Sequence, residues 1–242
     1  MVTAEAEFGP FSMIFSPTRL LRPGAGNKVG TVYQAFRPGV DRCHHDFRRS
    51  ELIDSGLLYG VSASAYLQAF PFGDLHFLIF PGGLDAHPLP QFMTHATHLM
   101  TIDMMHDATK FGGAILFSSL GSNATVNNLH LHYVEGLSPW FLRPETDQNS
   151  APLRIRSYAP CDSWGSIHFA QEHDLAHCVL YFRGQVHVCT RQKQGYYDAP
   201  ERTTDLAALE CLVGRFVAKS AQDLLLASTN ELAEYIARVA IR

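Results

Sequence analysis

The sequence predicts an α+β protein in which antiparallel sheets are covered by helices. Short apolar or alternating runs, such as residues 75–80 and 177–192, are typical of strands, and the stretch at 92–109 has the spacing of an amphipathic helix. The chain has 242 residues, 46% of them hydrophobic, which is enough for one domain near the upper end of the usual size. We expect one domain over residues 1–242, with a first half at about 1–145 and a second half at about 151–242.

The first half is expected to contain loops, a buried strand and a helix. Residues 1–50 are rich in Gly, Pro and Arg and predict loops with short strands. The apolar run at 75–80 ends at Pro81 and predicts a buried strand. The next segment predicts a helix in which Met and His side chains lie in the core or on a solvated face, and its apolar stripe contains Phe92, Leu99, Ile102 and Met105.

Two hairpins and a helical tail are expected to follow. The segments GGAILFSSL (112–120) and NNLHLHYVEG (127–136) predict two strands joined by a loop of small residues. A polar, proline-bounded link follows at 142–152, and the run at 177–192 then predicts a second hairpin that turns near Arg183-Gly184. In the tail, Ser228 stands three residues before Glu231, which is a capping-box pattern.

Composition and charge exclude several classes of partner. The formal net charge is −4 and 17% of residues are charged, so the basic surface needed for binding nucleic acid is not expected. The five cysteines are scattered and odd in number, which argues against a disulfide framework or a zinc ribbon and favours reduced thiols. No apolar run reaches the roughly 20 residues that cross a bilayer, and the first residues lack a leader pattern. We therefore expect a cytoplasmic protein with no membrane partner.

A polar ridge in the second strand of the first hairpin is the strongest candidate site. Residues two apart in a strand share one face, so Asn128, His130 and His132 lie together while the intervening apolar residues pack on the other face. A neutral imidazole is a nucleophile near pH 7. Two histidines on a strand can also be ordinary, partly exposed side chains. The preceding loop favours a phosphate site, since its donors include Gly121, Ser122, Asn123 and Thr125.

Other motifs compete less well with this ridge. The segment RCHHD (42–46) has metal-ligand residue types, but adjacent side chains splay apart and no second ligand pair has suitable spacing. The segment around Ser62 lacks the closing glycine of a hydrolase nucleophile elbow. The segment PGAGNKVG (23–30) fits neither the dinucleotide nor the phosphate-loop pattern. We expect no metal and no cofactor.

Several stretches resemble one known family. LFSSLGSNATVNNLHLHYVEG (116–136) is similar to the active-site stretch of the GDP-D-glucose phosphorylase and GDP-L-galactose phosphorylase family, which belongs to the histidine-triad superfamily and is related to galactose-1-phosphate uridylyltransferase. Further similar stretches follow the family's order, and the resemblance covers about residues 57–236. The chain departs from the family at Asn128, where histidine is usual, and at Cys178, where asparagine is usual. The other similar stretches are 72–92, 172–184 and 219–236.

The resemblance implies two fused histidine-triad-like halves and catalysis through a covalent nucleotidyl-histidine. His130 matches the nucleophile, and His132 matches the residue that bonds the phosphate or the departing oxygen. The main-chain carbonyl of residue 128, which Asn128 retains, is expected to accept the proton of the far ring nitrogen of His130. Donors of the loop, from Ser119 to Thr125, would stabilise the transition state. Arg191 and Lys193 are either phosphate contacts or ordinary solvated cations.

The implied reaction cleaves a nucleoside diphosphate sugar with inorganic phosphate. GDP-hexose is the substrate that the resemblance gives, and no residue pattern selects guanine over another base. Two alternatives stay open: a histidine-triad hydrolase that uses water as the acceptor, and a nucleotide-binding protein that has lost turnover through the change at Asn128. The sequence does not predict the oligomeric state.

Overall fold

The structure is a computed structural model, and it confirms the α+β class with antiparallel sheets and covering helices. It describes residues 4–17, 52–68, 71, 73–82, 89–122, 124, 128–144, 146, 153–193, 196–197, 201–203 and 212–241. Its main feature is one eight-stranded antiparallel sheet. In spatial order the strands are β3 (Leu52–Leu58), β4 (Val61–Leu67), β5 (His76–Pro81), β7 (Leu131–Glu135), β6 (Gly113–Ser118), β9 (Ala176–Phe182), β10 (Gln185–Arg191) and β8 (Ile155–Tyr158).

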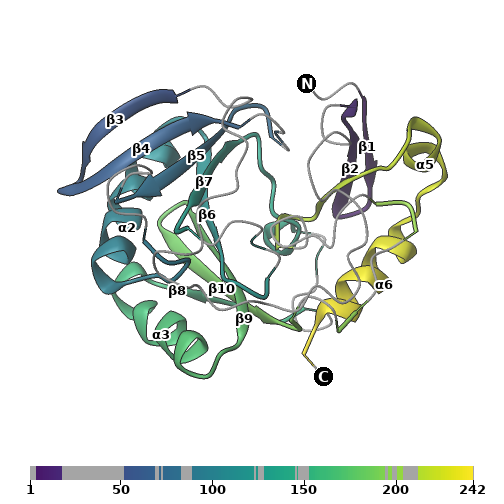
Figure 1. The fold of residues 1–242 in the computed structure, drawn as a ribbon. Helices are drawn as coiled ribbons and strands as arrows, with labels where there is room; N and C mark the ends of the chain where they lie inside the picture. Colours follow the sequence, from purple (N-terminus) through teal and green to yellow (C-terminus); the bar gives the residue numbers. More distant parts are fainter. Residues whose placement is uncertain are drawn as a thin grey trace.

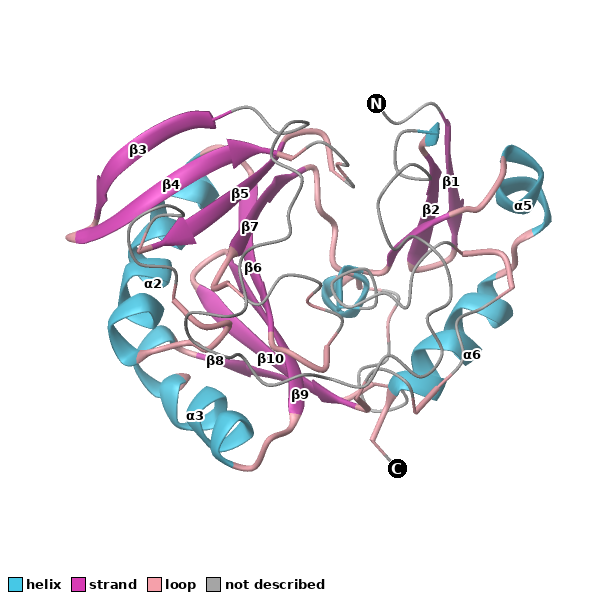
Figure 2. Cartoon of the chain, viewed as in Figure 1, coloured by secondary structure: helices cyan, strands magenta, loops and turns pink. Residues whose placement is uncertain are grey.

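Different elements cover the two faces of this sheet. Helices α2 (His95–Lys110) and α3 (Trp164–Glu172) lie side by side on one face (Figure 2). On the other side lies a small sheet of β1 (Ala4–Phe8), β2 (Phe11–Phe15) and β11 (Arg215–Val217) (Figure 1). In this sheet β1 pairs antiparallel with β2, and β11 pairs parallel with β2. The helices α5 (Ala221–Leu226) and α6 (Thr229–Val239) lie on the same side, and short 3-10 turns occur at Trp140–Leu142 and Pro160–Asp162.

The large sheet contains the same unit twice. The order β5, α2, β6, β7 is repeated as β8, α3, β9, β10, and the two units meet where β6 pairs with β9. The two units therefore have matching strand orders when each is followed from its outer strand to the junction: β5, β7, β6 in the first and β8, β10, β9 in the second. Each helix connects two parallel strands, β5 with β6 and β8 with β9, and the two units run in opposite directions because β6 pairs antiparallel with β9. Crossovers of the same hand therefore place both helices on one face of the sheet.

Two cores form because successive residues of a strand point to opposite faces. In β6, Ile115 and Phe117 pack with the methionines of α2 and with Ile167 of α3. Leu116 lies between them in sequence, and it joins the core that contains Phe216 and Tyr235 on the other side. The central strands are buried on both faces, which accounts for their nearly continuous apolar sequences.

The helix predicted near residue 95 is present, but its buried stripe differs from the prediction. Thr94 caps α2 by accepting a hydrogen bond from the Thr97 backbone N–H, so Phe92 precedes the helix and is 45% exposed. Leu99 is 48% exposed on the outer side, so the prediction was wrong for both residues. Met105 is buried as predicted, and the buried residues of α2 are Thr97, His98, Met100, Thr101, Met104, Met105 and Ala108.

The other local predictions agree with the structure where it describes them. The buried strand at 76–81 and both hairpins are present, and the second hairpin turns through Arg183 and Gly184, both at positive φ as a two-residue turn requires. Ser228 caps α6 by accepting from the Glu231 backbone N–H, which is one half of the predicted capping box, and the Glu231 carboxylate pairs with Arg202. The segments 42–46 and 23–30 lie outside the described residues. Among the described helices, none is long and apolar enough to span a membrane.

Candidate active site

The structure brings the polar ridge together on the sheet face that points away from α2 and α3. His132 in β7 lies opposite Leu78 of β5 and Leu116 of β6. His130 and Asn128 precede the first residue of β7, and Asn128 forms an isolated antiparallel bridge with Pro90. The ring centroids of His130 and His132 are 5.1 Å apart. The period-two spacing in the sequence thus predicts which side chains share this face.

One hydrogen bond determines which tautomer of His130 is present. Its Nδ1 lies 2.8 Å from the backbone carbonyl oxygen of Asn128. A carbonyl oxygen only accepts hydrogen bonds, so Nδ1 must carry the proton. In the neutral ring, Nε2 is then the unprotonated nitrogen that holds the reactive lone pair. The expected contact to the carbonyl of residue 128 is therefore present, and it comes from the main chain.

His132 is paired with a third histidine, which the sequence reasoning missed. His76 Nε2 lies 2.8 Å from His132 Nδ1, and one of these two nitrogens must donate. When His76 donates, His132 keeps its own proton on Nε2, where it can be given to a phosphate oxygen. His76 is 1% exposed at the start of β5. The signal in the sequence is an ionisable residue at the start of the otherwise apolar strand HFLIFP.

Gln91 joins the two arms of the first hairpin beside His130. The His130 backbone N–H donates to Gln91 Oε1 at 2.9 Å, and Gln91 Nε2 donates to the Ser118 carbonyl oxygen at 2.7 Å. Gln91 is 3% exposed, and its segment is held in place because the Leu129 backbone N–H donates to the Leu89 carbonyl oxygen at 2.8 Å. The Gln91 amide therefore determines where the backbone of His130 lies relative to the end of β6.

The small-residue loop is stabilised by its own serines. The Ser119 hydroxyl accepts from the His177 backbone N–H at 2.9 Å and donates to the Leu120 carbonyl oxygen at 3.0 Å. The Ser122 backbone N–H donates to the Ser119 carbonyl oxygen at 3.0 Å. Gly121 has φ +81°, which favours glycine. These serines thus have structural roles in the loop. The other two loop candidates, Asn123 and Thr125, lie outside the described residues.

The two candidate cations of the second hairpin have different environments. Arg191 is 2% exposed, and its Nη2 donates to the Tyr197 hydroxyl, so the alternative of a solvated side chain is wrong for this residue. Lys193 pairs with Asp174 and is partly exposed. Its stem lies beside the loop, because a Cβ built on Gly121 would be 3.5 Å from Lys193 Cγ. The structure therefore places Lys193, from the second half of the chain, next to the loop of the first half.

The site is enclosed. His130 is 5% exposed and Asn128 is 3% exposed, whereas His132 is half-buried. The Phe80 ring lies 5.9 Å from the His130 ring, centroid to centroid. Burial of this kind excludes water from a reacting centre and strengthens its electrostatic interactions. It also means that a group from outside reaches the His130 ring only when the side chains around the ring make way for it.

His177 supports the loop from the helix-covered side of the sheet. Its Nδ1 lies 2.8 Å from the Leu175 carbonyl oxygen, and its ring packs 5.8 Å from that of Phe117. Desolvation by burial lowers the pKa of His177 to about 4, so the ring is neutral at pH 7. His177 thus anchors the loop through its backbone bond to Ser119, and burial keeps its ring uncharged.

The comparisons with known proteins identify the fold. Yeast Ap4A phosphorylase Apa2 in complex with Ap4A has a TM-score of 0.65 at 11% identity, and the match covers 100% of this chain and 91% of that chain. Apa2 in complex with AMP has a TM-score of 0.60 at 13% identity, and the match covers 98% of this chain and 87% of that chain. No protein-family model and no curated protein matches the sequence. At such low identity the likeness shows the fold alone, which is histidine-triad-like.

Proposed function

We propose that this protein is a nucleotidyltransferase that acts as a phosphorylase on nucleotides with a pyrophosphate linkage. The observation that carries the proposal is the hydrogen bond from His130 Nδ1 to the Asn128 carbonyl, which leaves the lone pair on Nε2. The His132 ring lies beside the His130 ring and is oriented by His76. The likeness in fold to a nucleotide phosphorylase and the resemblance of residues 116–136 to a GDP-sugar phosphorylase family both support this reaction class.

The reaction proceeds in two displacements at the same phosphorus atom. In the first, His130 Nε2 attacks the α-phosphorus, a nitrogen–phosphorus bond forms, and the bond from that phosphorus to the bridging oxygen breaks. His132 donates its Nε2 proton to the departing phosphate, which leaves as sugar 1-phosphate when the substrate is a nucleoside diphosphate sugar. In the second, inorganic phosphate attacks the nucleotidyl-histidine, the nitrogen–phosphorus bond breaks, and nucleoside diphosphate is released.

Loop and cation donors would stabilise the anionic transition state. Preorganised hydrogen-bond donors and cations usually account for most of the rate enhancement in phosphate transfer. The backbone of the loop at 119–125 and the ammonium of Lys193 beside Gly121 are the groups of this chain that would supply them. Phosphate binding by Ser119, Gly121, Ser122, Asn123, Thr125 and Arg191 is part of the same proposal.

Two substrates fit this chemistry. GDP-hexose follows from the resemblance of the active-site stretch. A dinucleoside tetraphosphate such as Ap4A follows from the fold of the structural neighbour, whose match extends over nearly all of both chains. Both present a nucleoside α-phosphorus with a phosphate leaving group, so the His130 mechanism is the same for each.

Product analysis tests the proposal. The protein is incubated with GDP-glucose or with Ap4A, with and without inorganic phosphate, and nucleotides are separated by chromatography. We expect phosphate-dependent release of GDP, or of ADP and ATP, that His130→Ala abolishes and His132→Ala lowers by about 10²-fold to 10⁴-fold. His168→Ala, at a histidine whose side chain is 46% exposed on α3, is the matched control and keeps full activity.

Other outcomes separate the alternatives. Release of nucleoside monophosphate in place of nucleoside diphosphate, with or without phosphate, identifies a hydrolase: GMP from GDP-glucose, or AMP together with ATP from Ap4A. No turnover, together with a rise in melting temperature when nucleotide is added, identifies a binding protein, since a ligand that binds only the native state stabilises it. Full activity of His130→Ala would contradict the proposed nucleophile and make His132 the next candidate.

A further inference from the structure

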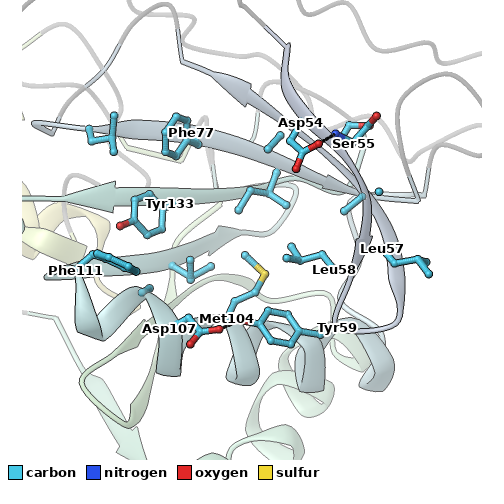
Figure 3. A pocket seen from close by; sticks show the side chains of 18 of the residues that line it. Asp54, Ser55, Leu57, Leu58, Tyr59, Phe77, Met104, Asp107, Phe111 and Tyr133 are labelled. Atoms are coloured by element: carbon cyan, nitrogen blue, oxygen red, sulfur yellow. Dashed lines mark hydrogen bonds between the residues drawn. The ribbon is translucent and has the colours of Figure 1, made fainter.

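A cavity lies on the sheet face opposite the histidines. It has a volume of about 460 Å³ and is bounded by the β3–β4 hairpin, the strands β5 and β7, and the last turns of α2 (Figure 3). Tyr133 and Glu135 of β7 line it, whereas His132, the residue before Tyr133, points to the other face. The cavity is within the size range of small-molecule sites in proteins.

Aromatic side chains form much of its wall. Phe77 and Tyr133 stack across two neighbouring strands with ring centroids 5.7 Å apart and an interplanar angle of 29°. Phe111, just after α2, is 72% exposed, and Tyr59 at the hairpin tip is 42% exposed. Met104 of α2 completes the apolar surface. Partly exposed aromatic faces of this kind attract apolar groups, and they also attract cations through the negative charge of the ring face.

All the charged residues that line the cavity are acidic. They are Asp54, Asp107 and Glu135, and no Lys, Arg or His is among the lining residues, all of which the structure describes. The Tyr59 hydroxyl donates to Asp107 and so ties the hairpin tip to α2 across the cavity, and the Tyr133 hydroxyl donates to Glu135 at 2.5 Å. Lys110 offsets one of the three charges through its ion pair with Asp107. The remaining charge at the cavity is negative.

We propose that this cavity binds a small organic ammonium ion that carries an apolar body. The apolar body occupies the space between Phe77, Tyr133 and Met104, and the ammonium lies at an aromatic face, where the negative charge of the lining carboxylates favours it. The charge of the lining disfavours anions, so nucleotides and inorganic phosphate are not its ligands. The proposal is independent of the reaction at His130, because the cavity and the histidines lie on opposite faces of the sheet.

Binding of three matched probes tests this charge preference. Phenylbutylammonium, phenylbutanol and phenylpentanoate share a phenyl ring and a four-carbon chain but are cationic, neutral and anionic. We expect isothermal titration of the full chain to show the cation binding on the order of five-fold more tightly than the alcohol, and the anion more weakly than either. Ala65→Phe fills the cavity from the half-buried face of β4 and abolishes binding of all three probes.

Charge variants test whether the lining carboxylates select the cation. Asp54→Asn combined with Glu135→Gln removes the preference for the cation and leaves the affinity of the alcohol unchanged. Glu234→Gln on α6 removes one negative charge, as Glu135→Gln does, and serves as its control. We expect it to leave all affinities unchanged. Circular dichroism and thermal melting verify that each variant is folded. Equal affinity for cation and anion, no binding of any probe, or binding that Ala65→Phe does not reduce would overturn the proposal.

Discussion

Replacing Gln91 by leucine should lower the stability of the protein and disturb the position of the His130 backbone. The substitution removes both hydrogen bonds and leaves the His130 backbone N–H and the Ser118 carbonyl buried without their partner. Each unsatisfied buried group costs about 1 to 3 kcal/mol, so we expect the free energy of unfolding to fall by about 2 to 6 kcal/mol. Urea denaturation followed by circular dichroism measures this loss.

A glutamate at the same position separates the two hydrogen bonds. Its carboxylate can still accept from the His130 N–H, but it cannot donate to the Ser118 carbonyl until it is protonated. Burial and the facing carbonyl raise the pKa of this carboxyl, so Gln91→Glu should lose stability relative to the native protein as pH rises through that pKa. Phosphate-dependent nucleotide release should show the same pH dependence. We expect kcat rather than KM to change, because losing the bond to Ser118 displaces His130, the proposed nucleophile.

Gln171 provides a matched control. Its side chain also bridges two backbone groups, accepting from the Met93 N–H at 2.8 Å and donating to the Met93 carbonyl at 2.9 Å, but it does not contact His130. Gln171→Leu should lower stability and leave kcat of the remaining folded protein unchanged. If Gln91→Leu and Gln171→Leu have the same effect on kcat, or if Gln91→Leu is as stable as the native protein, the argument for Gln91 is refuted.

Three further predictions concern the histidines. Asn128→Ala keeps the main-chain carbonyl, so turnover measured by product release should stay within about tenfold of the native value, and a loss as large as that of His130→Ala would contradict the tautomer argument. His76→Ala should lower kcat on the order of tenfold and shift the pH profile, because it acts through His132; an unchanged pH profile would refute that role. Burial lowers the folded-state pKa of His177 to about 4, so its contribution to stability is complete above pH 6.5 and declines by about 3 kcal/mol as pH falls toward 4. His177→Gln should reduce this decline in acid denaturation, and an unchanged decline would contradict the role of His177.

The periodic features of this chain could be predicted from its sequence. The buried strand at 76–81, the hairpins and the face shared by His130 and His132 follow from alternation alone, because the side-chain period of a strand is fixed at two. The N-cap of the last helix follows from the position of Ser228. The stripe of α2 was less predictable, since the start of a helix decides which residues face inward, and Thr94 starts it after Phe92.

Contacts between distant segments could not be predicted in this way. His76 and Gln91 reach the site only because β5 pairs with β7 and the segment at 89–91 lies against residues 128–130. The burial of Arg191 depends on Tyr197, and the position of Lys193 beside Gly121 depends on how the second half packs on the first. Pairing of segments that lie far apart in the chain leaves no local pattern in a single sequence.

Trapping the covalent intermediate tests the central claim most directly. The protein is mixed with GDP-glucose or Ap4A in the absence of phosphate, quenched under alkaline conditions that preserve phosphoramidates, digested and analysed by mass spectrometry. We expect a nucleoside monophosphate on the peptide that contains His130, its disappearance when phosphate is added, and none in His130→Ala. An adduct on another residue, or product formation with no adduct at His130, would contradict the account.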